Sequence, residues 1–364
     1  MKFYIIAGEA SGDLHGANLI KAISNQHPDA EFRVWGGDKM EAAGAVLVKH
    51  YRELAFMGFV EVIANLRTIL SNLKLCKEDI LAYKPDALIF IDYPGFNLRL
   101  APFAKKHGIR SFYYILPQIW AWKKSRVKIL ERNVESLYSI LPFEEKFYKD
   151  YDVDFNFVGH PLLDEIQDFK AKATSDASKP VLLLLPGSRM QELKKILPIM
   201  LKTASKKSKY DVIVGKASSL DAKVYEELMT DYPNIKLSDE GTYSLLSRSS
   251  LALVTSGTAT LETALFKVPQ VVCYRGSFIS IEIAKRIVDI PYISLVNLIA
   301  NKELVKELIQ EDLNETNILT EIEKLESEEG RRRISEEYTK LIELLGKSGA
   351  SDLTAKLLLK TLSS

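Results

Sequence analysis

Acidic side chains follow two apolar runs in the first half of the chain, where they could contact a ligand. Asp92 comes directly after "ALIFI", and Glu9 comes shortly after "FYIIA". A carboxylate at the carboxyl end of a buried strand can act as a general base, since ligands of α/β sheets bind at that edge. Ser11 and Asp13, in the stretch "GEASGD", belong to the same expected rim. Asp92 can instead begin an Asx turn before Pro94, and out of context the residues slightly favour that role.

The stretch "GEASGD" is placed like a phosphate-binding turn but matches neither common motif. A dinucleotide fold has G-x-G-x-x-G and a P-loop has G-x-x-x-x-G-K-[ST]. This turn has Gly8 and Gly12 and no lysine after them. The spacing therefore indicates neither NAD nor ATP.

Two strand-turn-helix units in the second half have the design of an anion-binding turn. In "VLLLLPGSRMQEL" an arginine ends the turn, where its guanidinium could bind a diphosphate bidentately. In "LALVTSGTATLE" small residues let a diphosphate approach a helix N-terminus, and Glu262, about one turn later, could bind a ribose diol. Helix caps and a surface arginine give similar patterns, but two such turns in one domain favour ligand binding. The turn residues are Gly187, Ser188, Arg189, Ser256, Gly257 and Thr258.

The elements that must position these residues alternate along the chain. Short apolar runs typical of strands buried on both faces are separated by helical stretches, which is the pattern of a parallel sheet with helical crossovers. The series restarts once, after the polar stretch at residues 167–180. We therefore expect an α/β protein of two Rossmann-like, doubly wound domains, residues 1–165 and 166–340. Residues 341–364 are expected to form a helix that packs back toward the first domain.

The totals of the sequence exclude several classes of protein. The 364 residues include 49 Lys and Arg against 48 Asp and Glu, so no global charge favours nucleic acid. Cys76 and Cys273 are isolated and the five histidines lack ligand spacing, so neither a metal site nor a cofactor is expected. Asp150, Asp152 and Asp154 are interpreted as solvated loop charges. No run approaches the roughly 18 apolar residues of a membrane span.

Two segments could still contact a membrane surface. The stretch "ELAFMGFVEVIANLRTILSNLKL", residues 53–75, has more apolar residues around Gly58 than one side of a helix needs, although a core face is the ordinary interpretation. The stretch "PQIWAWKKSRVK" places tryptophans beside cations, which suits the interface between acyl chains and anionic headgroups; a solvated basic helix face explains it equally well. The expected contacts are Phe56, Met57, Phe59, Val60, Lys123, Lys124, Arg126 and Lys128.

Nine motifs follow one another between residue 3 and about residue 310. They are "AGEASGDLHGANL", "ELAFMGFVEV", "IDYPGFN", "PQIWAWKKSRV", "LPFEEKFY", "FVGHPL", "LLPGSRMQE", "SGTATLE" and "YISLVNLIA". In this order they resemble the lipid-A-disaccharide synthase family, glycosyltransferases of Gram-negative lipid A synthesis. The resemblance implies a GT-B fold, in which a membrane-facing acceptor domain and a UDP-sugar-binding domain face each other across a cleft.

The same resemblance implies a reaction and a location. The expected reaction is an inverting transfer of 2,3-diacylglucosamine from UDP-2,3-diacylglucosamine to 2,3-diacylglucosamine 1-phosphate. Its products would be a β-1,6-linked disaccharide 1-phosphate and UDP. The expected location is cytoplasmic, peripheral on the cytoplasmic face of the inner membrane.

Roles follow for residues that match the family's motifs. The resemblance implies that Asp92, in "IDYPGFN", is the catalytic base and that Glu9 and Ser11 line the cleft. It also implies that Arg189 and the "SGTATLE" turn, through Glu262, face the UDP. On this interpretation the "GEASGD" turn contacts sugar and need not hold a nucleotide.

The chain departs from the family's pattern at two positions. The family usually has "SLPNL" where this chain has "SLVNL", so Val296 replaces a proline beside Asn297, an expected substrate contact. That puts the position of Asn297 in doubt. Gly95 stands where some members have a second acid, which puts an acidic pair in doubt.

Two other functions remain open on the sequence. One is a different UDP-sugar enzyme of GT-B fold, either a UDP-N-acetylglucosamine 2-epimerase or a muramyl-lipid transferase. The apolar stretch "ELAFMGFVEV" argues against the soluble epimerase. The other is a non-catalytic, membrane-peripheral UDP-sugar-binding protein, against which the presence of Asp92 with both anion-binding turns argues.

Overall fold

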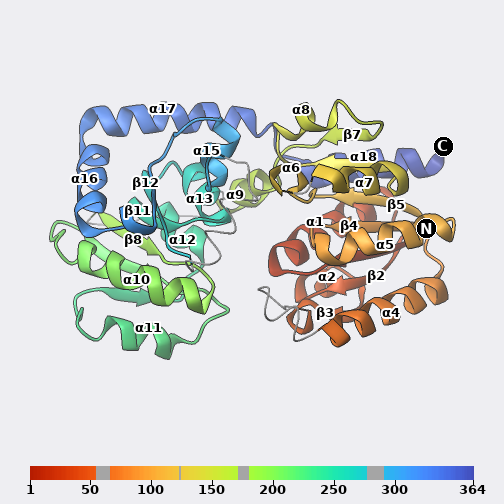
Figure 1. Cartoon of the computed structure of the whole chain (residues 1–364), viewed down its shortest axis with the longest axis horizontal. Helices are drawn as coiled ribbons and strands as arrows, with labels where there is room; N and C mark the ends of the chain where they lie inside the picture. The colour runs from red at the N-terminus through yellow and green to blue at the C-terminus, as the bar shows by residue number, and fades with distance from the viewer. Residues whose placement is uncertain (55–65, 123, 171–179, 277–290) are drawn as a thin grey trace. The chain divides into compact units, whose positions relative to one another are not determined.

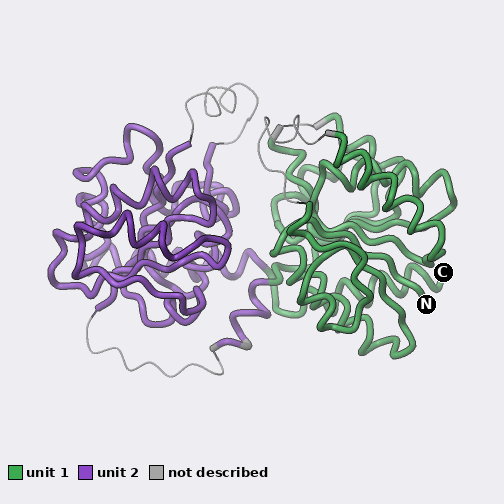
Figure 2. Tube along the Cα trace, turned by 90° about the horizontal axis from the view of Figure 1, so that it is seen from below, with its two compact units in different colours: residues 1–161, 346–364 green, residues 162–345 purple. Residues whose placement is uncertain are grey.

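The computed structural model describes the chain except for residues 55–65, 123, 171–179 and 277–290. The described chain forms two compact units (Figure 2): residues 1–161 and 346–364 make unit 1, and residues 162–345 make unit 2. Each unit has its own parallel sheet and its own hydrophobic core. The expected doubly wound α/β architecture is confirmed (Figure 1).

Unit 1 contains a seven-stranded parallel sheet in the order β3-β2-β1-β4-β5-β6-β7. The central strands β1 and β4 are apolar and almost wholly buried, because helices cover both faces of the sheet. The strands are β1 (Lys2–Ala7), β2 (Glu31–Gly36), β3 (Val46–His50), β4 (Ala87–Ile91), β5 (Arg110–Tyr114), β6 (Ser136–Ser139) and β7 (Asp154–Phe157). The helices are α1 (Ala10–Gln26), α2 (Asp38–Ala42), α4 (Leu66–Tyr83), α5 (Pro94–Lys106), α6 (Ile119–Trp122), α7 (Val127–Asn133), α8 (Glu144–Tyr148) and α18 (Ala350–Ser363), with short 3-10 turns at Tyr51–Glu53 and Lys124–Arg126.

Unit 2 contains a six-stranded parallel sheet in the order β10-β9-β8-β11-β12-β13. The strands are β8 (Val181–Leu185), β9 (Asp211–Gly215), β10 (Lys236–Ser238), β11 (Ser249–Thr255), β12 (Gln270–Tyr274) and β13 (Glu307–Ile309). The helices are α9 (Leu162–Lys170), α10 (Met190–Ala204), α11 (Ala222–Met229), α12 (Thr242–Ser247), α13 (Thr258–Leu265), α15 (Leu295–Ala300), α16 (Glu315–Glu326) and α17 (Glu328–Leu344), with a 3-10 turn at Gln310–Asp312.

Each sheet reverses its strand order once. The reversal lies between β1 and β4 in unit 1 and between β8 and β11 in unit 2. At such a point the helices that follow two neighbouring strands leave toward opposite faces, which opens a crevice at the carboxyl edge. The turns after these four strands are therefore the positions in which a ligand is best accommodated.

The C-terminal helix α18 belongs to unit 1, although the chain reaches it from unit 2. It packs against α1. The guanidinium of Arg110, paired with Glu135, donates hydrogen bonds to the last carbonyls of α18, at 2.6 Å to Thr361 and 3.2 Å to Leu362. A cation at a helix C-terminus is favourable because it meets the negative end of the helix dipole. Among the described residues no helix is both long enough and apolar enough to cross a membrane.

Asp13 lies at the rim on which the sequence places it, in the first turn of α1, but its side chain has a structural role. Its side chain is buried, and its carboxylate accepts hydrogen bonds from the backbone N–H groups of Gly37 (2.7 Å), Lys39 (3.1 Å) and Met40 (3.1 Å). These groups lie at the start of α2. Asp13 of α1 thus satisfies the unpaired donors of a second helix, as an N-cap residue does.

Replacing Asp13 with alanine should lower the free energy of unfolding of unit 1 by about 3 kcal/mol, because three N–H groups lose a charged acceptor. The tryptophans Trp35, Trp120 and Trp122 all lie in unit 1, so urea unfolding followed by their fluorescence reports this unit. Asp29→Ala, at an exposed position, is the matched control. An Asp13→Ala midpoint equal to that of the control would contradict the assignment.

Candidate active site

The turns after β1 and β4 are neighbours at the carboxyl edge of the unit 1 sheet. The last residues of the two strands are paired, so Glu9 and Asp92 both follow the point at which the strand order reverses. Gly8 packs against the ring of Tyr93, and a Cβ atom at position 8 would lie 2.4 Å from that ring. Glycine at this position therefore allows the two turns to approach each other.

The backbone of Asp92 is held in a strained conformation. Asp92 has a φ of 43° and Tyr93 a φ of 48°, in the left-handed region that residues other than glycine rarely adopt, at a cost of about 1–3 kcal/mol each. The carbonyl of Asp92 accepts hydrogen bonds from the Tyr113 hydroxyl (2.5 Å) and the Asn97 amide (2.8 Å). Its N–H donates to the carbonyl of Ile115 (3.1 Å). The fold thus sets the direction of the Asp92 side chain.

Burial and a neighbouring charge hold Asp92 near the point of half-ionisation at neutral pH. Burial, followed by the negative charge of Glu9, raises the pKa of Asp92 to about 7, against the effect of a hydrogen bond from the backbone of Tyr93. A general base works best with a pKa near the working pH, since it is then ionised and still basic. The arrangement can therefore accept a proton from a bound hydroxyl group.

Glu9 and Ser11 are both exposed at the N-terminal end of α1. Glu9 is the N-cap residue of this helix, but its side chain makes no capping hydrogen bond. A carboxylate and a hydroxyl group are thus accessible beside Asp92. Both groups suit contact with the hydroxyls of a sugar.

Two turns of unit 2 flank the reversal in its sheet. Gly187, after β8, has a φ of 105°, and a Cβ atom there would lie 2.8 Å from Oε2 of Glu192 and 3.1 Å from Thr255. Gly257, the N-cap residue of α13, has a φ of 153°, and apart from its chain neighbours and the adjoining helix backbone no heavy atom of the described chain lies within 4 Å of where a Cβ atom would be. Open space therefore faces a helix N-terminus, where backbone N–H groups and the helix dipole favour an anion.

Two charged residues of these turns have contrasting environments. Arg189 is exposed, and its Nη1 lies 3.2 Å from Oε1 of Glu192. Glu262 lies in α13 with its Oε1 3.5 Å from the hydroxyl of Tyr243, and burial raises its pKa to about 7. The guanidinium can reach a diphosphate in solvent, whereas Glu262 can accept a hydrogen bond in a desolvated position.

The hydroxyl groups of the turns are in part used by the protein itself. Oγ of Ser256 donates to the carbonyl of Ile293 at 2.8 Å. In the other turn the backbone carbonyl of Ser188 accepts a hydrogen bond from Oγ of Ser219 at 2.9 Å. Thr258 is the first residue of α13. The backbone N–H groups of the turns, more than the Ser256 hydroxyl, are therefore available to a diphosphate.

Asn297 differs from its expected role. Its side chain is fully buried, and its amide nitrogen donates to the carbonyl of Val305 (2.8 Å) and to Glu307 (2.9 Å). Its Oδ1 accepts from the N–H groups of Leu304 (2.8 Å) and Val305 (2.9 Å). All its polar capacity is used inside unit 2, so the side chain holds the segment before β13 and is not placed to contact substrate. The neighbouring Val296 is also fully buried, as an apolar side chain in a core should be.

Sequence reasoning missed two residues that fix the candidate base. Tyr113 lies in β5 beside β4, and its partner is the carbonyl of Asp92. A tyrosine inside a buried strand needs a partner for its hydroxyl group, and that need was the available signal. Asn97 was within a quoted motif, but only the turn geometry reveals that its amide binds Asp92.

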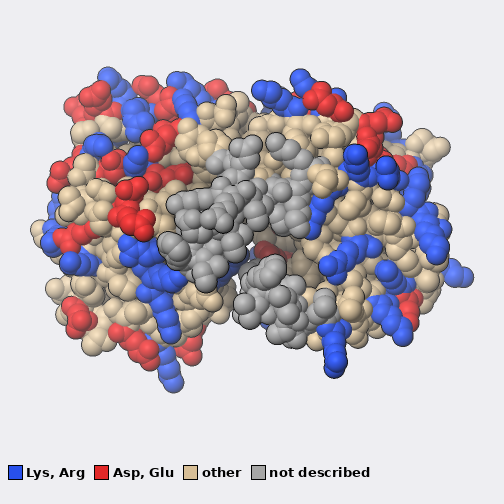
Figure 3. Space-filling view, viewed as in Figure 1, with Lys and Arg blue, Asp and Glu red and all other residues tan. Residues whose placement is uncertain are grey.

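The membrane contacts expected from the sequence lie mostly outside the described residues. This applies to Phe56, Met57, Phe59, Val60 and Lys123. The backbone of Lys124 belongs to a 3-10 turn, Arg126 is half-buried, and Lys128 is exposed on α7. Figure 3 shows Lys and Arg side chains gathered on the face of unit 1 on which α5 and α7 lie.

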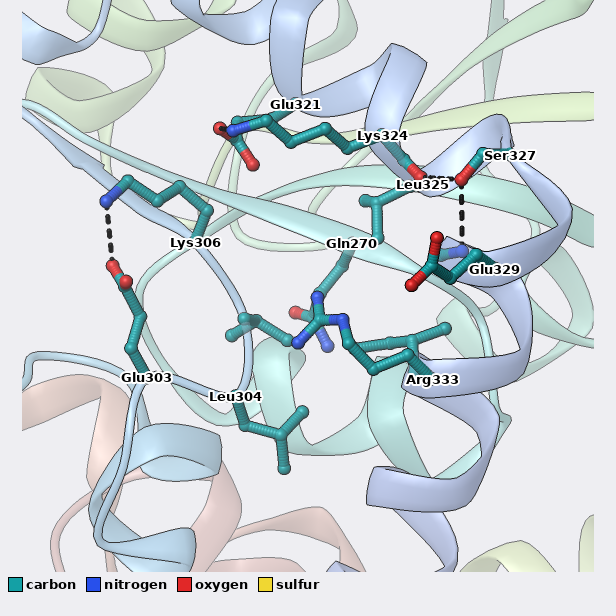
Figure 4. Close-up of a pocket in the computed structure, with 13 residues that line it drawn as sticks. Gln270, Glu303, Leu304, Lys306, Glu321, Lys324, Leu325, Ser327, Glu329 and Arg333 are labelled. Atoms are coloured by element: carbon teal, nitrogen blue, oxygen red, sulfur yellow. Dashed lines mark hydrogen bonds and ion pairs between the residues drawn. The ribbon is translucent and has the colours of Figure 1, made fainter.

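A cavity of about 450 Å³ in unit 2 lies away from these turns. It is lined by Gln270, the first residue of β12, and by residues that precede β13, so it opens at the amino edge of the sheet (Figure 4). Arg333 extends toward Gln270 at its centre. At about 3.3 Å per residue, the length of β12 separates this cavity from the carboxyl edge by roughly 13 Å. Within the described ranges, His, Cys, Asp and Glu side chains form no group that could hold a metal ion.

Comparison with known proteins adds independent observations. Residues 3–361 match the family model described as lipid-A-disaccharide synthetase. The lipid-A-disaccharide synthase of Syntrophus aciditrophicus is 39% identical, over 96% of this chain and 95% of that protein. That of Geobacter sulfurreducens is 34% identical, over 99% of this chain and 97% of that protein.

Solved structures show the same fold at low sequence identity. A UDP co-structure of S. aureus MnaA has a TM-score of 0.70 at 13% identity and covers 100% of this chain and 97% of that one. The glycosyltransferase of kitacinnamycin has a TM-score of 0.66 at 13% identity; the match covers 99% of this chain and 98% of that one. Together with the family match over nearly the whole sequence, these observations show that the chain belongs to the lipid-A-disaccharide synthase family and is a glycosyltransferase.

Proposed function

We propose that this protein transfers 2,3-diacylglucosamine from UDP-2,3-diacylglucosamine to 2,3-diacylglucosamine 1-phosphate, with UDP as the leaving group. The observation that carries the proposal is Asp92, a carboxyl group directed by a strained turn, with a pKa raised to about 7, in a chain of this family. The family supports a lipid A disaccharide as the product. A carboxyl group with this pKa supports a reaction in which a hydroxyl group gives up its proton as it attacks.

The proposed mechanism is a single displacement with inversion. Asp92 takes the proton of the acceptor's 6-hydroxyl as that oxygen attacks the anomeric carbon of the donor. The bond from this carbon to the diphosphate breaks, and UDP leaves with the electron pair. Arg189 and the N-termini of α10 and α13 supply positive potential for the leaving diphosphate, and Glu262 binds the ribose.

Release of UDP tests the proposal against its alternatives. A glycosyltransferase releases UDP from UDP-2,3-diacylglucosamine only when the lipid acceptor is present. A 2-epimerase alters UDP-N-acetylglucosamine without any acceptor, and a binding protein releases no UDP. Acceptor-dependent release with formation of a β-1,6-linked product supports the transfer, and its absence overturns it.

Asp92→Asn should lower kcat about a hundredfold or more, because an amide cannot accept the proton, while affinity for the donor stays within about twofold. The measurements are steady-state UDP release and calorimetric binding of UDP. Asp86→Asn, at an exposed position of the same unit, is the control. Near-normal kcat in Asp92→Asn would remove Asp92 from the role of base.

Glu9→Gln should move the acidic limb of the kcat/KM profile to lower pH. The negative charge of Glu9 raises the pKa of Asp92, so its removal lowers that pKa and leaves Asp92 ionised in more acidic solution. The profile is measured with Glu41→Gln as a control, since Glu41 is an exposed acid of unit 1. A limb that stays in place, or moves to higher pH, contradicts the coupling.

Both substrates carry acyl chains, and we infer that unit 1 binds an anionic membrane surface. The helix α4 exposes Leu70, Leu75 and Leu81, and it follows the apolar segment singled out in the sequence. Exposed leucines can insert shallowly into the headgroup region, and each nearby cation adds about 1 kcal/mol on an anionic leaflet. The protein would then act at the inner membrane from its cytoplasmic side.

Vesicle flotation should show binding to phosphatidylglycerol-containing vesicles that weakens with NaCl but does not vanish, since apolar insertion is insensitive to salt. Met57→Glu should reduce the salt-resistant part, and Lys123→Glu with Lys124→Glu the salt-sensitive part. Vesicles of phosphatidylcholine alone are the control for charge. Wild-type protein that stays unbound at low salt, or variants that bind as wild type does, would contradict the inference.

A further inference from the structure

Glu144 is a fully buried acid that the proposed reaction leaves without a role. It is 1% exposed and begins α8, shortly after β6. Its Oε1 accepts a hydrogen bond from Nε1 of Trp120 at 3.0 Å, and its Oε2 makes a short hydrogen bond with Oγ of Ser139, the last residue of β6. One carboxyl group thus joins the end of β6 to α6, which follows β5.

The segment that Trp120 helps to hold reaches Asp92. It runs from the end of β5 into α6, and it begins with Ile115, whose carbonyl accepts the N–H of Asp92 at 3.1 Å. Ile115 has a φ of 62°, which is an outlier for a β-branched residue. Its own N–H donates to the carbonyl of Tyr138 in β6 at 3.1 Å. A strained segment must be held at both ends, and Glu144 holds the end at Trp120.

We propose that Glu144 is a positioning residue of the active site: through Trp120 it fixes the segment between β5 and α6, and through Ile115 it fixes the backbone of Asp92. The inference rests on the proposed function, because positioning matters only if Asp92 is the base. Glu144 itself contacts neither substrate nor reacting atoms in this role.

The hydrogen-bond geometry at Ser139 accommodates a protonated Glu144. Oγ of Ser139 lies 3.1 Å from the carbonyl of Leu141, and it accepts the N–H of Leu141 at 3.1 Å. The hydroxyl has one proton. If Glu144 is protonated it can donate to Ser139, which then donates to Leu141. If Glu144 is ionised, Ser139 must turn its proton to the carboxylate, and the carbonyl of Leu141 loses this donor.

Burial favours the protonated form of Glu144 at neutral pH. Burial raises the pKa of Glu144 to about 8; the hydrogen bonds of Ser139 and Trp120 oppose this, and the charge of Asp92 adds to it. In the part of the chain described, Asp92 and Tyr148 are the titratable groups coupled to Glu144, and the pKa of Tyr148 is raised, so Tyr148 is neutral there. Around pH 7 to 8, Asp92 is therefore the more ionised of the two acids and Glu144 the more protonated. Above that range the hydrogen bonds at Ser139 rearrange.

The test compares Glu144→Gln, Glu144→Ala and the control Glu145→Gln, at the adjacent exposed acid. UDP release is measured from pH 6 to pH 10 with both substrates present. Glutamine reproduces the shape and the donor of a protonated glutamate, so Glu144→Gln should stay within about threefold of wild type at pH 7.5. Glu144→Ala should lose about tenfold or more in kcat with little change in KM. The wild type and Glu145→Gln should lose activity above about pH 8, whereas Glu144→Gln should not.

A second readout does not depend on activity. Ionisation of Glu144 should change the fluorescence of Trp120 with a midpoint near pH 8, and the change should be absent in Glu144→Gln and in Trp120→Phe. An alkaline limb that persists in Glu144→Gln, wild-type activity in Glu144→Ala, or a fluorescence change that survives in Glu144→Gln overturns the inference. If the wild type releases no UDP, the proposed function fails, and the fluorescence still decides whether Glu144 holds Trp120.

Discussion

The parallel pairing of β1 with β4 and of β8 with β11 is the constraint on which the rest of the structure depends. Parallel strands bring their carboxyl ends to one edge, and the helices that follow begin at that edge with unpaired N–H groups. In unit 1 this edge presents carboxyl groups beside the N-terminus of α1. In unit 2 it presents glycine-containing turns beside the N-termini of α10 and α13. The four strands β1, β4, β8 and β11 contribute no candidate functional side chain of their own. They hold the turns in register.

Asp92 concentrates three unfavourable contributions in one residue. It lies in a left-handed turn, its carboxyl group is largely desolvated, and it lies near the like charge of Glu9. A flexible turn would relax each of these, so they persist only because the neighbouring strand and helix hold the backbone. Tyr113 and Asn97 bind its carbonyl, and Ile115 binds its N–H. The raised pKa and the fixed direction of Asp92 therefore depend on the rigid edge of the sheet as well as on the aspartate itself.

The fold and the turns could be predicted from the sequence, because both follow from local pattern. Apolar runs of strand length identify a parallel sheet, and glycine with small residues identifies a turn. The partners of buried polar groups could not be predicted, since they lie far away in sequence. The place of Asp13 on the rim did not reveal that its carboxylate caps α2, and Asn297 was expected at the substrate although it holds the segment before β13. Glu144, in the motif "LPFEEKFY", is buried although the neighbouring Glu145 and Lys146 are exposed, and the motif alone does not distinguish them.

The desolvated acids of this protein are of two kinds: one stabilises the fold, and the others have raised pKa values. The carboxylate of Asp13 is matched by three N–H donors, so it stabilises the fold. Asp92, Glu144 and Glu262 instead have pKa values raised from 3.8 or 4.5 to about 7, 8 and 7, with burial as the first cause. The folded state then binds protons more tightly than the unfolded chain, so the stability these groups contribute is complete below about pH 4 and is lost as pH rises through 7 to 8. Asp92 becomes ionised, and so active as a base, over the range in which the fold loses that stability. At that pH the free energy of unfolding must come from the apolar cores and from hydrogen-bonded groups such as Asp13.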